Sequence, residues 1–254
     1  MTEYEWLCST DPAAMLAHVR GKVSDRKLRL FAVACVRSCW HLLADARSRN
    51  AVEIAERYAD GEATREQVYH ATAGLTTMAG CLSDDFDGHQ QAASVIDSAR
   101  LHNTAALPTY AALLREIVGN PFRPFKRFGN AVCDHTMLEL FEATPQVRAI
   151  AAAAYAERGS EKCEACKGTG GTWEPKCCVP CHGTGRIERG HLDADRLAVL
   201  ADCLEDNGCT NEDILMHLRG KERCPVKHHD HDWRKLRGPH VRGCWCLDLL
   251  TGRE

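Results

Sequence analysis

The sequence lacks several features that would assign a compartment or a partner. It has no run of about 18 apolar residues, which a membrane-spanning helix requires. Its first residues, Met-Thr-Glu-Tyr-Glu-Trp, lack the basic and apolar regions of a secretory signal. There is no charge excess either, since 32 Lys and Arg stand against 35 Asp and Glu. We therefore expect a cytoplasmic protein with no membrane partner. A uniformly basic nucleic-acid coat is excluded, whereas a local basic patch is not.

Sequence motifs of common enzyme classes are also missing. The chain contains no Walker-type phosphate loop, no nucleotide-binding G-x-G-x-x-G after a predicted strand and no G-x-S-x-G elbow. Aromatic residues make up only 6% of the 254 residues, and Ala-rich stretches typical of helices are frequent. These observations favour a helical protein without a recognisable catalytic constellation.

Helical patterns cover most of the chain. Thr10-Asp11-Pro12 and Ser24-Asp25 each combine a capping residue with a helix start. The stretch 30–36 is apolar on all sides, which predicts a central buried helix that carries Cys35 and Cys39 in the core. The predicted helices cover residues 12–20, 24 onward, 47–60, 63–82, 90–102, 108–118, 131–142, 145–157, 193–205 and 211–218, with a short closing helix through 250.

One connector between these helices has an unusual composition. Pro121 and Pro124 forbid a regular element, and three Phe alternate with the cations Arg123, Lys126 and Arg127 before Gly129. We interpret the segment as a link whose Phe side chains fill the core. The alternative is a surface on which bases stack and phosphates bind.

The composition changes sharply over residues 161–187, which hold five Cys and five Gly and cannot build an apolar core. Two C-x-x-C-x-G-x-G units lie here, and their cysteines are Cys163, Cys166, Cys178 and Cys181. Each C-x-x-C turn presents two thiolates, and two such turns complete a tetrahedron around Zn²⁺. Four thiolates leave no open coordination position, so the predicted ion is structural. Cys177 and His182 are substitute donors that this spacing disfavours.

The C-x-x-C-x-G-x-G unit resembles the cysteine-rich zinc domain of DnaJ-type co-chaperones, which carries four such units and two zinc ions. The present chain has two units, enough for one ion, and no His-Pro-Asp tripeptide of a J domain. The resemblance implies the four cysteines as zinc ligands. It also implies turn glycines at Gly168, Gly170, Gly183 and Gly185. It implies no stimulation of a chaperone ATPase.

The rest of the chain resembles an uncharacterised helical bacterial family that is expanded in planctomycetes. The segments that carry this resemblance begin at Asp25 (DRKLRLFAVAC), Gly119 (GNPFRP), Leu200 (LADCLEDNGC) and Gly238 (GPHVRGCW). In that family a short link joins the helix near 145–157 to the helix at Leu200, and here the cysteine-rich unit occupies the link. A second extra segment spans about 221–237. The resemblance implies a fold and no reaction.

A second group of metal-capable residues lies near the C-terminus. Cys224, His228 and His231 fall within a few residues of one another, and His240, Cys244 and Cys246 follow. They suggest a second zinc site, and an open position on such an ion would support hydrolysis. The alternative is a basic surface loop, because no two-knuckle spacing supports the site.

The sequence therefore predicts a mostly α protein, a multi-helix domain with a small inserted four-cysteine zinc hairpin. The predicted units are a helical domain over 1–160, the zinc insert over 161–190, and C-terminal helices over 191–254 that pack back on the first unit. The predicted function is a non-enzymatic zinc-containing binding or scaffold protein that recognises a protein or peptide through the insert. One alternative is nucleic-acid binding through the zinc knuckle and the basic stretches at 123–127 and 221–242. The other is a metal-dependent hydrolase or thiol redox protein that uses the C-terminal His/Cys cluster.

Overall fold

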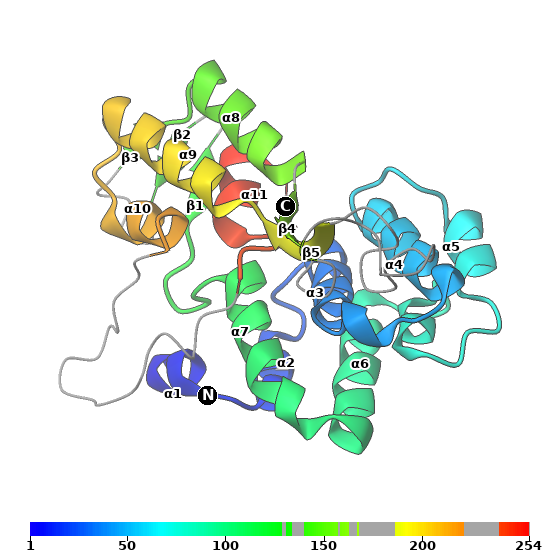
Figure 1. The fold of residues 1–254 in the computed structure, drawn as a ribbon. Coiled ribbons are helices and arrows are strands. Elements are labelled where there is room, and N and C mark those ends of the chain that lie inside the picture. Colours follow the sequence, from blue (N-terminus) through cyan, green and yellow to red (C-terminus); the bar gives the residue numbers. More distant parts are fainter. Residues whose placement is uncertain are drawn as a thin grey trace.

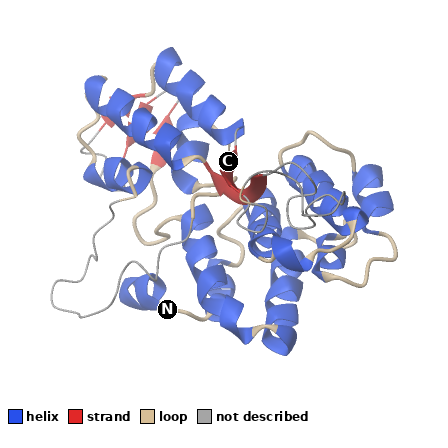
Figure 2. Ribbon diagram, in the orientation of Figure 1, coloured by secondary structure: helices blue, strands red, loops and turns tan. Residues whose placement is uncertain are grey.

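The computed structural model describes residues 1–128, 131–133, 140–156, 158–162, 167, 186–220 and 239–253. Its described part is mostly helical, as predicted (Figures 1 and 2). The α-helices are α1 (Glu3–Cys8), α2 (Pro12–Val19), α3 (Asp25–Ser38), α4 (Ala46–Ala59), α5 (Arg65–Thr72), α6 (Gly88–His102), α7 (Leu107–Val118), α8 (Pro145–Ala156), α9 (Ala194–Asp206), α10 (Glu212–Leu218) and α11 (Trp245–Thr251). The 3-10 turns are η1 (Trp40–Leu42), η2 (Met78–Leu82) and η3 (Thr104–Ala106). No described helix combines the length and the apolar character needed to cross a membrane.

The first hydrophobic cluster, which we call the N-terminal cluster, is built around α3. This helix contacts α4, α6 and α7, and all but one of its residues from Leu28 to Val36 are buried. The cluster takes its buried side chains from the chain between Trp6 and Ile117, and Val241 joins it from far along the sequence. Cys35 and Cys39 lie in this core, and the Cys39 thiol contacts the Tyr110 hydroxyl at 3.6 Å. The prediction of a central buried helix is therefore confirmed.

A second hydrophobic cluster, the C-terminal cluster, is formed by β2 and α8 to α11. It extends from Val132 to Leu250, and its buried residues include Tyr155 and Leu247. Helix α8 contacts α9 and α11, while α10 contacts α9 and α11. In Figure 1 these four helices gather on one side of the molecule and α2 to α7 on the other. The described part of the chain thus contains two separate apolar cores.

Two helix predictions are wrong. The segment 131–142 contains two short strands, β2 (Ala131–Cys133) and β3 (Leu140–Glu142), which form an antiparallel sheet with β1 (Lys126–Phe128). Three-residue strands are too short for an alternating pattern to appear in the sequence. The helix expected over 63–82 is divided into α5 and η2, because the chain turns at Gly74, where φ is +71°.

The predicted zinc hairpin falls on a segment whose two ends the structure brings together. Strand β4 (Arg158–Lys162) pairs antiparallel with β5 (Arg186–Leu192), so residues 162 and 186 are neighbours. The β4–β5 pair lies between the two groups of helices, and β5 contacts α3 (Figure 2). Cys163, Cys166, Cys178 and Cys181 lie outside the described residues, and so the hairpin and the predicted unit boundaries remain predictions.

Candidate metal centre

Four metal-capable side chains converge where the two hydrophobic clusters meet. They are Glu116 from α7, His217 from α10, and His240 and Cys244 from the turn before α11. One donor atom from each residue lies within 4.8 Å of the other three. The Glu116 Oε1 atom is 2.8 Å from His240 Nδ1 and 3.6 Å from His217 Nε2, which in turn lies 3.2 Å from Cys244 Sγ. We call these four residues the Glu/His/His/Cys cluster.

The chain around the cluster fixes each of these side chains. Gly119 ends α7 three residues after Glu116 with a φ of +76°, and its lack of a Cβ atom allows the Trp245 ring to pack against its backbone. The Asn211 side chain caps α10 by accepting a hydrogen bond from the Ile214 amide. The Leu192 amide at the end of β5 donates to the His240 carbonyl oxygen. The four donors are therefore positioned by ordinary secondary structure from both clusters.

The cluster is shielded from solvent. Glu116, His217, His240 and Cys244 are 7%, 2%, 9% and 0% exposed. The ring centroids of Trp245 and His217 are 4.8 Å apart, and Phe125 stacks on Trp245 with ring centroids 5.2 Å apart. Nε2 of His240 is buried without a hydrogen-bond partner in the described part of the chain. A buried carboxylate and two buried imidazoles need compensating charge or ligation, because desolvation of polar groups is costly.

The ionisation of these groups reflects their proximity. Burial alone would raise the pKa of Glu116, but the neighbouring His240 and His217 outweigh it and hold that pKa well below its usual range. Burial alone would lower the pKa of His240, but the Glu116 carboxylate outweighs it and raises this pKa to about 9. Cys246, two residues beyond Cys244, is fully buried, and burial raises the pKa of its thiol.

The donor set and its dimensions fit a tetrahedral zinc ion. Imidazole nitrogen, thiolate sulfur and carboxylate oxygen are the usual zinc ligands. With zinc–ligand bonds of about 2.0–2.3 Å, neighbouring ligands lie about 3.3–3.6 Å apart. Three of the six separations, 2.8, 3.6 and 3.2 Å, differ from these values by about half an ångström or less. All six are within 4.8 Å, so the side chains need to close by up to about 1 Å to bind one ion. His240 would bind the ion through Nδ1, the ring nitrogen that faces the Glu116 carboxylate, so both residues can serve as ligands of one ion.

The structure brings together only part of the predicted C-terminal site. His240 and Cys244 lie in the cluster, whereas Cys246 is buried nearby without belonging to it. Cys224, His228 and His231 lie outside the described residues. The sequence analysis missed Glu116 and His217. The sequence signal that could have identified them is a charged or polar residue on the apolar face of a predicted helix.

The aromatic and basic connector contains strand β1, so the prediction that its prolines exclude a regular element is wrong after Pro124. Its Phe side chains pack against the cores, as its first interpretation predicted. Phe122 packs against the N-terminal cluster and stacks on His18, with ring centroids 5.1 Å apart. Phe125 packs against the C-terminal cluster beside Trp245. Arg123 pairs with Glu3 at 2.8 Å. Two of the three Phe rings thus pack against other side chains of the protein. This packing does not support base stacking by the segment.

Comparisons with known proteins add no further assignment. No family model, curated protein or solved structure matches this chain. The two resemblances described from the sequence therefore remain predictions.

Proposed function

We propose that this is a metal-binding protein in which the Glu/His/His/Cys cluster holds one Zn²⁺ ion with a structural role. The observation that carries the proposal is the convergence of four buried donors of the types zinc prefers, within 4.8 Å of one another. They come from three elements that are distant in the sequence. Nothing in the hydrophobic packing of the two clusters requires such polar groups at this position.

Charge balance supports the proposal. The Glu116 carboxylate and a Cys244 thiolate together carry two negative charges, and two neutral imidazoles complete the set. A divalent cation would neutralise these two charges with both imidazoles uncharged, whereas without an ion a protonated His240 is the partner of the Glu116 carboxylate. Zinc binding removes the proton from a coordinating thiol, so the buried Cys244 can serve as a thiolate ligand.

Four protein ligands and a buried position favour a structural over a catalytic role. Catalytic zinc sites leave one position for water or substrate, whereas structural sites are closed by four ligands. The Trp245 ring additionally packs beside His217, and Phe125 stacks on Trp245. The metal-dependent hydrolase considered from the sequence is therefore the less supported alternative.

The proposal is tested by counting zinc in untagged protein by native mass spectrometry. His217→Gln removes one ligand of the cluster, and Cys163→Ser removes one ligand of the predicted four-cysteine site. We expect His217→Gln to lose one zinc per chain relative to wild type. If the four-cysteine motif also binds zinc, Cys163→Ser loses a different ion, and the double variant loses both.

The matched control is His70→Gln, because His70 lies on the surface of α5 with its side chain 71% exposed. This variant should keep the zinc content of the wild type. An unchanged zinc count in folded His217→Gln would contradict the proposed site.

We further propose that the four-cysteine motif recognises a protein or peptide partner. The support is the sequence pattern alone, since its cysteines lie outside the described residues. Deletion of residues 163–185 should remove partners captured by the wild type, and an unchanged set of partners would contradict this role.

A further inference from the structure

The Glu/His/His/Cys cluster lies at the boundary between the two hydrophobic clusters. We call this boundary the seam. Glu116 belongs to α7 of the N-terminal cluster, while His217 and Cys244 belong to elements of the C-terminal cluster. Some apolar contact crosses the same seam, since Val241 joins the N-terminal cluster and Gly243 packs against Leu30. The seam is thus a place where the two cores are joined largely through specific polar contacts.

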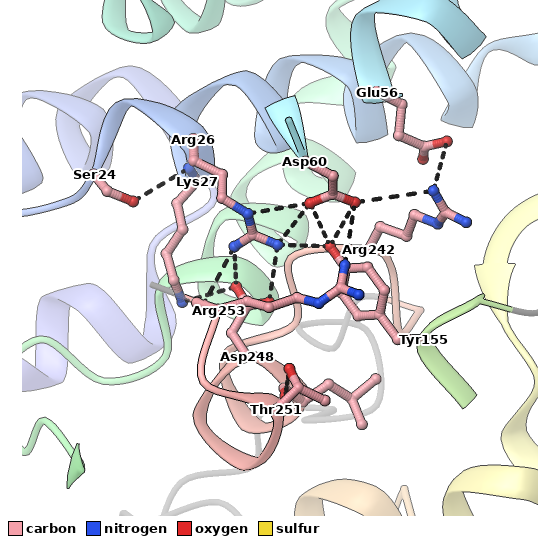
Figure 3. Close-up of polar contacts among 11 residues, drawn as sticks. Ser24, Arg26, Lys27, Glu56, Asp60, Tyr155, Arg242, Asp248, Thr251 and Arg253 are labelled. Carbon is pink, nitrogen blue, oxygen red and sulfur yellow. Dashed lines mark hydrogen bonds and ion pairs between the residues drawn. The ribbon is translucent and has the colours of Figure 1, made fainter. Parts of the chain in front are cut away.

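A buried ion network forms a second part of this seam (Figure 3). Arg26 of α3 binds Asp60, at the end of α4, at 2.8 Å and Asp248 of α11 at 2.8 Å. The Arg26 guanidinium also donates to the Tyr155 hydroxyl of α8 at 2.7 Å. The side chains of Asp60 and Asp248 are 0% and 1% exposed. Arg26 and Asp60 lie on the N-terminal side of the seam, and Tyr155 and Asp248 lie on the C-terminal side.

One short segment takes part in both contacts. Residues 239–253 supply His240 and Cys244 to the cluster and Asp248 to the ion network. Between them, Arg242 lies 3.9 Å from both Glu56 and Asp60, and it donates to the Ala156 carbonyl oxygen. The amide of Cys244 donates to the Val241 carbonyl, and the amide of Asp248 donates to the Cys244 carbonyl. The order of this segment therefore depends on attachments at both ends.

We propose that zinc bound to the Glu/His/His/Cys cluster links the two hydrophobic clusters through its ligands. We call this role of the ion a clasp. The proposal rests on the proposed function, because it needs an ion at that site. Binding of the ion joins α7, α10 and the turn at 240–244, and so holds residues 239–245 against both cores. Loss of the ion frees this turn, while each hydrophobic cluster keeps its own packing and the ion network retains α11.

The test is hydrogen exchange on the full chain, measured by mass spectrometry beside the zinc count. Wild type, Cys163→Ser and His217→Gln are compared, and Cys163→Ser is also treated with a chelator. The informative peptides contain the amides of Leu192, Cys244 and Asp248, whose hydrogen bonds involve residues 240–244. The reference peptides come from the middle of α3 and from α9.

We expect exchange around residue 244 to be at least 10-fold faster in His217→Gln and in chelated Cys163→Ser than in wild type. Untreated Cys163→Ser should match the wild type, and the α3 and α9 peptides should be unchanged throughout. Loss of zinc from His217→Gln without faster exchange near residue 244 would overturn the clasp and leave the proposed function standing. Faster exchange in all peptides together would also overturn it, since the ion would then support the whole fold. An unchanged zinc count would remove both proposals.

Discussion

Gly243 shows how one residue sets the approach of the turn at 240–244 to α3. Its φ is +86°, and a Cβ atom added there would lie 2.9 Å from Leu30 Cδ1. Gly243→Ala should lower the free energy of unfolding by about 2–4 kcal/mol, because it combines backbone strain with overpacking. The measurement is urea unfolding followed by circular dichroism.

Gly208 offers a matched control for this substitution. It has the same φ of +86°, but a Cβ atom there would meet nothing within 4 Å. Gly208→Ala should therefore lower the free energy of unfolding only through backbone strain, by about 1–2 kcal/mol. Equal decreases in the free energy of unfolding in the two variants would show that overpacking against Leu30 does not destabilise Gly243→Ala.

Glu116 contacts both histidines of the cluster through its carboxylate. Glu116→Gln should weaken zinc binding at the cluster by about 10-fold to 100-fold or more, because a neutral amide replaces one of the four proposed ligands. Chelator competition in the Cys163→Ser background measures this affinity. Glu66→Gln, at a side chain that is 83% exposed, should leave the affinity unchanged. An unaltered affinity in Glu116→Gln would exclude the carboxylate as a ligand of the ion.

At the scale of elements, Tyr155 joins α8 to the N-terminal helices. Its hydroxyl accepts from Arg26 and donates to the Asp60 carboxylate at 3.0 Å (Figure 3). Tyr155→Phe keeps the ring but removes one hydrogen-bond partner from Arg26 and from Asp60. We therefore expect the free energy of unfolding to fall by about 1–3 kcal/mol. Tyr69→Phe is the control, because Tyr69 is 52% exposed and its change should stay within about 0.5 kcal/mol in urea unfolding. Equal stabilities of Tyr155→Phe and wild type would argue against a supporting role for this hydroxyl.

Local signals predicted most helices because they act over a few residues. Asp11 and Ser24 cap α2 and α3 as expected, and Gly119 ends α7. The same kind of signal could not predict the cluster, because Glu116 and His217 come from helices that look ordinary by themselves. His240 and Cys244 were recognised as metal-capable only by their type and proximity. The strands at 126–142 were missed because their pairing is a tertiary property that three residues do not encode.

At the scale of the whole molecule, zinc should act as a ligand of the folded state. A ligand that binds only the native protein adds about 2.7 kcal/mol of stability when its free concentration is 100 times its Kd. We expect the Cys163→Ser variant to show this rise with buffered zinc, and Cys163→Ser combined with His217→Gln to lack it. Thermal unfolding at fixed free zinc concentrations measures the difference. Equal responses in the two variants would place the stabilising ion elsewhere.

The spacing of the cluster along the chain has a consequence for biosynthesis. Glu116 and His240 are 124 residues apart, and ribosomes add about 5–20 residues per second. The helices of the N-terminal cluster are therefore complete roughly 6–25 seconds before the last ligands have been made. Until residue 217 has been added, neither histidine partner of Glu116 exists. The metal centre can be assembled only as one of the last events in the maturation of residues 1–253.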